Sequence, residues 1–173
     1  MKKSTILIAA TAAAAAMAMS CTKENAARFE GDYSFKTSGT VSAVPADTPE
    51  GTAADTVTLS VLPESGQMNI IRDGKSRTDM VITMNIMGGD AVVFDRVNAE
   101  GLVLTLLQPY VTRRVSVETG SGIGYADVTV SGKAEKFTDV ILFDFEYTGT
   151  VTDGDTVYRI TDSAVDCVAK END

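Results

Sequence analysis

Apolar and polar residues alternate through this chain from about residue 30 onward. The pattern is clearest in the stretch 138–149, where Phe143 and Phe145 fall on one face and Asp144 and Glu146 on the other. A period of two places alternate side chains on one side of a β-strand, whereas a helix needs a period near 3.6. No segment after residue 30 has a convincing helical period, so the alternation predicts an all-β domain.

Short turn sequences separate the alternating segments. Gly and Asp are concentrated in RDGKS (72–76), MGGD (87–90), NAEG (98–101) and TDGDT (152–156), which are typical of hairpin turns. The segments themselves are 32–41, 55–62, 67–73, 79–87, 90–97, 102–108, 110–118, a short 125–132, 138–149 and 156–169. Close spacing without helical crossovers favours an antiparallel meander. We expect it to close into a barrel of about eight strands, with a β-sandwich as the alternative.

The first 20 residues have the order of a secretory signal. Lys2 and Lys3 precede an apolar run from residue 6 to residue 19, which is shorter than the ~20 residues needed to span a bilayer. The alternative is a buried alanine-rich helix. We therefore expect residues 1–20 to be a signal peptide that takes no part in the fold.

The signal ends in AMSC, residues 18–21, which resembles a bacterial lipobox. The resemblance implies that Cys21 is acylated and becomes the N-terminus, whereas the alternative is an ordinary secretory signal cut nearby. Residues 21–30 would then form the lipidated Cys21 and a polar tether, and residues 31–173 a single domain. Multiple acyl chains anchor a protein stably. We expect attachment to an outer membrane, on its periplasmic face or at the cell surface.

Composition argues against several functions. The net charge of −9 disfavours contact with nucleic acid phosphates. The sequence contains no histidine, which removes the commonest general base and metal ligand. Cys167 is expected to be a strand cysteine, and Asp144 and Glu146 a solvated face. We therefore expect no catalytic residue, metal or cofactor, and a hydrolase is the least favoured reading.

A pocket inside the barrel would be lined by large inward residues. Methionine adapts to varied apolar ligands, although packing of the core is its usual role. The candidate pocket residues are Tyr33, Phe35, Met80, Met84, Phe143 and Phe145. Arg113 and Arg114 should point to opposite faces of a strand, so one of them could face a cavity and hold an acidic group. The other reading places both at the rim or surface.

Several phrases together resemble a known family. They are AMSC, GDYSFKTSGTV, ESGQMNI, TMNIMGGDAVVFD, VTVSGK and YRITDSAVDCVAKEND. They look like the small lipoproteins of Bacteroides-type gut bacteria with a calycin-like, or lipocalin-like, β-barrel. The resemblance implies a barrel on a lipid anchor and carries over no catalytic residue. We expect a non-enzymatic envelope lipoprotein that binds a small, partly apolar ligand. The alternative is a structural or protein-interaction lipoprotein of an envelope assembly.

Overall fold

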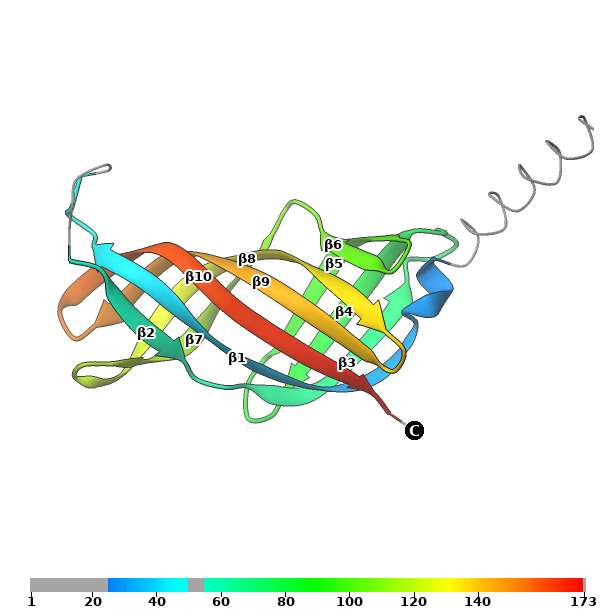
Figure 1. Ribbon diagram of the computed structural model, residues 1–173, viewed down its shortest axis with the longest axis horizontal. Coiled ribbons are helices and arrows are strands. Elements are labelled where there is room, and N and C mark those ends of the chain that lie inside the picture. The colour runs from blue at the N-terminus through cyan, green and yellow to red at the C-terminus, as the bar shows by residue number, and fades with distance from the viewer. Residues whose placement is uncertain (1–24, 50–54, 173) are drawn as a thin grey trace, which may run out of the picture.

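The chain forms one antiparallel sheet of ten strands (Figure 1). The computed structural model describes residues 25–49 and 55–172, so the predicted signal and Cys21 lie outside the described residues. A short 3-10 helix, η1 (Ala26–Arg28), precedes the sheet. The strands are β1 (Gly31–Pro45), β2 (Val57–Val61), β3 (Ser65–Arg72), β4 (Asp79–Ile86), β5 (Ala91–Glu100), β6 (Val103–Leu106), β7 (Val111–Thr119), β8 (Gly122–Phe137), β9 (Val140–Asp153) and β10 (Thr156–Glu171). The predicted all-β class is confirmed.

Eight of the strands form a closed hydrogen-bonded ring. Going around it, β1 is followed by β3, β4, β5, β6, β8, β9 and β10, and β10 pairs with β1 again. All of these pairs are antiparallel. The prediction of an antiparallel meander that closes on itself through about eight strands is confirmed, and the ring is barrel-like.

Two long strands change partner along their length. Residues 31–36 of β1 pair with β3, whereas residues 39–43 pair with β2. Likewise, β8 pairs with β7 over residues 122–130 and with β6 over residues 133–135. Two groups of strands therefore connect β1 to β8 on the side opposite β9 and β10. We call them the wide panel (β3–β6), which belongs to the eight-strand ring, and the narrow panel (β2 and β7). Figure 1 shows them at opposite ends of the long strands.

The interior follows the alternation that the sequence predicts. On β9, Ile141, Phe143, Phe145 and Tyr147 are all buried, whereas the intervening Asp144 and Glu146 are exposed. The rings of Phe94 and Phe145 stack with their centroids 5.9 Å apart. Each large side chain that leaves water in this way contributes about 1.5–3 kcal/mol to folding. One continuous apolar core therefore holds both panels against the long strands.

The segment before β1 is also packed. Ala26 and Phe29 are almost completely buried, and the Tyr33 hydroxyl donates a hydrogen bond of 2.9 Å to the Phe29 carbonyl. The polar tether was expected to reach residue 30, but from Ala26 onward the chain is part of the folded domain. The sequence hides this because Phe29 stands alone in a polar stretch and has no periodic partner.

Strand β8 is longer than the expected short segment 125–132. It spans Gly122–Phe137, and small residues occupy inward positions both within the expected segment, at Ala126, and beyond it, at Ala134. Between them, Gly132 has φ of +145°, and a Cβ there would lie 2.2 Å from the Asp144 carbonyl oxygen. Alanine and glycine give a weak apolar signal, so the alternation is hard to see in the sequence at these positions.

We predict that Gly66→Ala destabilises the fold. A Cβ at Gly66 on β3 would lie 1.9 Å from the Asn85 carbonyl oxygen on β4, so the paired backbones must shift. We expect the free energy of unfolding, measured in urea, to fall by about 1–3 kcal/mol. Gly120→Ala is the matched control, because no atom lies within 4 Å of the added Cβ. An unchanged unfolding curve for Gly66→Ala would contradict the register of β3 and β4.

Candidate functional site

A cleft of about 460 Å³ opens where the two panels separate. Its lining residues come from the end of β4, the β4–β5 turn, the start of β5, the start of β7, and the link between β2 and β3. Residues 91–94 of β5 pair along one edge with β4, and residues 111–115 of β7 pair along one edge with β8. The cleft volume lies within the range of small-molecule pockets, about 300–1,000 Å³.

Glu64 enters the cleft from the link between the panels. Thr37, at the point where β1 changes partner, donates its backbone N–H to the Glu64 carbonyl at 2.8 Å. The Glu64 backbone N–H donates in return to the Thr37 hydroxyl at 2.9 Å. Thr37 is buried, so these bonds satisfy polar groups that water does not reach. They also fix where the Glu64 side chain begins.

Arg113 meets Glu64 from the other side. It occupies an inward position of β7, between Val111 and Val115, and its guanidinium donates to the Glu64 carboxylate. Only 12% of the Arg113 side chain and 19% of the Glu64 side chain are exposed. The Arg113 Nε is buried and has no hydrogen-bond partner among the described residues. The cleft is therefore lined by a poorly solvated ion pair whose Arg113 Nε–H makes no hydrogen bond within the described residues.

The next residue, Arg114, faces the opposite way. It forms two hydrogen bonds, of 2.8 and 2.9 Å, with Asp127 on the outer surface of β8. More than half of each side chain is exposed. The hydrogen bond from Arg114 lowers the pKa of the Asp127 carboxyl below its usual value. The prediction that the two arginines point to opposite faces is therefore confirmed, and the inward one is Arg113.

Apolar side chains complete the cleft. Val92 is buried, and Ile86 and Val111 are partly buried beside the ion pair. Apolar walls with a few converging polar groups are the usual composition of ligand pockets. The arrangement can hold a small molecule through apolar contact and one oriented hydrogen bond.

The charges of this ion pair affect the pKa values of two buried groups, Tyr147 and Cys167. Burial raises the pKa of Tyr147 to about 12, and the positive charge of Arg113 opposes that rise. Burial also raises the pKa of Cys167 to about 12, with a smaller contribution from the negative charge of Glu64. Cys167 lies on β10 opposite Thr37 of β1 and is completely buried. Its thiol stays protonated at neutral pH and is a poor nucleophile.

The six residues proposed to line a pocket lie in the core instead of the cleft. All are at most 4% exposed: Tyr33, Phe35, Met80, Met84, Phe143 and Phe145. The rings of Phe143 and Phe145 are 5.4 Å apart, so they pack on each other. Phe35 also borders a surface hollow near Gln67 and Met87. A role for these six residues in ligand binding stays a prediction.

Sequence reasoning missed Glu64 as a site residue. PESG (63–66) has the composition of a turn, and no local pattern distinguishes a turn glutamate that pairs with an arginine 49 positions away. Thr37 gave a usable signal, because it continues the inward positions of Tyr33 and Phe35 as a polar residue. A polar residue on a buried face requires a partner, and here the partner is the Glu64 backbone.

We predict strong coupling between Arg113 and Glu64. In a double-mutant cycle with Arg113→Met and Glu64→Leu, we expect a coupling energy of about 2 kcal/mol, because each single change leaves a poorly solvated charge. The matched cycle on Arg114 and Asp127 should give much weaker coupling, since water screens that exposed pair. Urea unfolding measures both cycles. Equal coupling in the two pairs would contradict the buried position of Arg113.

We also predict that stability declines in alkali. A raised pKa in the folded state means that the folded protein holds the proton more tightly than the unfolded chain. The contribution of Cys167 is therefore complete below about pH 9 and is lost as pH rises toward about 12. Urea unfolding from pH 8 to 11 should show this decline, with a shallower slope for Cys167→Ala. Identical slopes would place the Cys167 thiol in contact with water.

Comparisons with known proteins provide no family for this chain. No protein-family model matches it, and neither a curated protein nor a solved structure does. Over residues 25–49 and 55–172, no group of three or more His, Cys, Asp or Glu side chains is placed to hold a metal ion. The same residues include no helix long and apolar enough to cross a membrane. The chemistry of the cleft is therefore the basis for a functional proposal.

Proposed function

We propose that this chain is a lipid-anchored protein of the cell envelope that binds a small, partly apolar ligand in the cleft between its panels. The observation that carries the proposal is the Arg113–Glu64 ion pair beside the apolar side chains of Ile86, Val92 and Val111. In this proposal the ligand occupies the side of the ring, not the interior filled by Phe143, Phe145 and their neighbours.

The charge of the cleft limits the ligand class. Glu64 balances the charge of Arg113, and the lining also carries Asp90 and Arg114. An anionic ligand would therefore add an unbalanced charge to a poorly solvated site. A neutral carbonyl or hydroxyl oxygen can accept from the Arg113 guanidinium without that cost. We therefore favour a neutral or zwitterionic molecule with an apolar part over the acid head group considered from the sequence.

Binding without catalysis fits the available side chains. The sequence supplies no histidine, and the raised pKa of Cys167 argues against a thiolate nucleophile. Asp144 and Glu146 lie on the exposed face of β9, outside the cleft. These features support a binding protein.

The location is proposed from the N-terminal sequence. Lys2, Lys3, the apolar run and the lipobox-like AMSC support a signal peptide followed by acylation at Cys21. The proposed site is the outer membrane, on either its periplasmic or its outer face. Cys21 precedes the first described residue, Asn25, by four positions.

The alternative is a protein-interaction role, and the strand edges at the cleft favour it. Among residues 25–49 and 55–172, no strand pairs with the second edge of residues 91–94 of β5 or of residues 111–115 of β7. An extended peptide from another envelope protein could add to such an edge. This reading predicts a peptide partner and no retained small molecule.

The test is native mass spectrometry of the full acylated protein, purified gently from its own host. We expect an intact mass that carries the acyl chains and one small molecule that is lost on denaturation. Arg113→Met/Glu64→Leu removes the ion pair without leaving a single buried charge, so it should stay folded. We expect it to bind the retained molecule about 10- to 100-fold more weakly, since a hydrogen bond to a charged group contributes about 1.5–3 kcal/mol.

Arg72→Met/Glu30→Leu is the matched control and should retain the ligand, because this ion pair of 2.7 Å does not line the cleft. Retention by the Arg113→Met/Glu64→Leu variant would place the ligand outside the cleft. A protein from its host with no small molecule bound would favour the peptide-binding alternative. An unmodified N-terminus would refute the lipid anchor separately from the cleft.

A further inference from the structure

An apolar patch lies on the outer surface of the wide end of the ring. Its members are Leu102, Val103, Phe137, Leu142 and Val168, each between 37 and 49% exposed, and we call them the anchor-end patch. Pairing places them on adjacent strands, because Val103 pairs with Glu135, Glu135 with Leu142, and Leu142 with Val168. A shallow hollow of about 330 Å³ lies among Val103, Phe137 and Leu142. Grouped exposed apolar side chains usually mark a contact surface.

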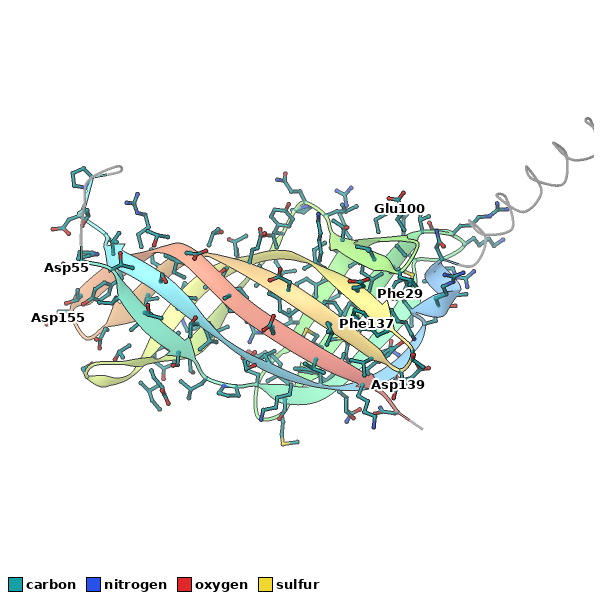
Figure 2. The ribbon with its side chains drawn as sticks, in the orientation of Figure 1. Phe29, Asp55, Glu100, Phe137, Asp139 and Asp155 are labelled. Atoms are coloured by element: carbon teal, nitrogen blue, oxygen red, sulfur yellow. The ribbon has the colours of Figure 1, made fainter. Side chains whose placement is uncertain are left out.

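A short series of hydrogen bonds links this patch to the N-terminal segment. The backbone N–H of Lys136 donates to the Leu102 carbonyl at 2.9 Å, and its ammonium donates to the Tyr33 hydroxyl at 3.0 Å. Tyr33 in turn donates to the Phe29 carbonyl. Figure 2 shows Phe29 and Phe137 at the same end of the molecule. The chain therefore leaves the folded domain beside the patch.

The distance to the proposed anchor is short. Asn25 follows Cys21 by four positions, and a chain of that length reaches at most about 14 Å. Whatever its conformation, this segment keeps the wide end of the ring close to a membrane that holds Cys21. Tethering raises the effective concentration of the two surfaces, so even a weak affinity of the patch for lipid leads to contact.

Carboxylates also lie at the opposite end. Asp155 lies in the β9–β10 turn, and the neighbouring Asp153 accepts a hydrogen bond of 2.9 Å from Thr119 at the end of β7. Figure 2 shows Asp55 and Asp155 at this end, far from Phe137. Around the patch the charges are mixed, with Lys133 and Lys170 close to Glu135 and Asp144. Glu100 and Asp139 also lie at this end (Figure 2). Contact through the patch keeps the acidic end away from lipid phosphates.

We propose that the anchor-end patch rests on the lipid surface that holds Cys21, with Phe137 and Leu142 in the boundary between head groups and acyl chains. The proposal rests on the lipid anchor of the proposed function, and it adds a fixed orientation. The cleft, which opens between the panels, is then held away from the membrane plane by the wide end of the ring. A protein interface of ordinary size buries roughly 800 Å² on each partner, whereas a tethered lipid contact needs only a few inserted side chains.

The sequence allows a clean fluorescence experiment, because it contains no tryptophan. Phe137→Trp and Leu142→Trp place a single probe in the patch, and Val157→Trp places one at a similarly exposed position near the β9–β10 turn. The full chain is expressed with its signal sequence, checked for acylation by intact mass, and reconstituted in phosphatidylcholine vesicles. Parallel vesicles carry bromine on the acyl chains, which quenches tryptophan at short range.

We expect the two patch probes to emit at shorter wavelength and to lose about half of their fluorescence in brominated vesicles, since interfacial side chains reach roughly 5–10 Å into the boundary. The Val157→Trp probe should be unaffected. Equal quenching at all three positions, or none at any, would overturn the orientation. A dimer of the unacylated protein that dissociates with Leu142→Lys would also overturn it, by assigning the patch to a second copy.

Different results refute the lipid anchor and the lipid contact of the anchor-end patch. An intact mass without acyl chains would refute the anchor, and the patch is then tested by coupling the Cys21 thiol to a maleimide lipid in the same vesicles. The coupling is selective, because Cys167 is buried and its pKa is raised. Quenching of the patch probes in the coupled protein supports the lipid contact without the natural anchor. An acylated protein whose patch probes remain in water refutes the lipid contact alone.

Discussion

The structure depends on one change of partner in strand β1. Around Thr37 this strand leaves β3 and takes up β2, and the chain between those two strands must cross the gap. The paired hydrogen bonds between Thr37 and Glu64 fix that crossing in a buried position. Because backbone groups there are out of reach of water, leaving them unpaired would cost about 1–3 kcal/mol each. The partner change therefore determines where one panel ends and the other begins.

The cleft follows from this division. A ring of strands bonded along every edge has no opening in its side, but two panels that diverge from shared strands leave a gap between β5 and β7. Glu64 lies at that gap because the crossing chain places it there, and Arg113 because it is an inward residue of β7. The same geometry buries the Glu64–Arg113 pair, so water only weakly screens the attraction between its two charges. A structural requirement of the fold thus supplies the polar group of the proposed binding site.

The two ends of the ring differ in chemistry, and this difference underlies the proposed orientation of the protein on the membrane. Phe29 and Tyr33 close the wide end, beside the apolar side chains of Phe137 and Leu142. Carboxylates such as Asp155 occupy the far end (Figure 2). A protein anchored next to an apolar patch at one end has a preferred orientation at a lipid surface. The cleft between the panels then faces sideways, where a soluble ligand or a neighbouring protein can reach it.

The sequence by itself determined the all-β class, the antiparallel segments along the chain and inward residues such as Phe143 and Phe145, because a period of two depends only on neighbours along the chain. It also placed Arg113 and Arg114 on opposite faces. It underestimated β8, whose inward alanines give little apolar contrast, and it left Phe29 in a tether. Only the tertiary structure decided that β1 changes partner at Thr37 and that Glu64 meets Arg113. Those contacts join residues far apart in the chain, and no local pattern encodes such a distance.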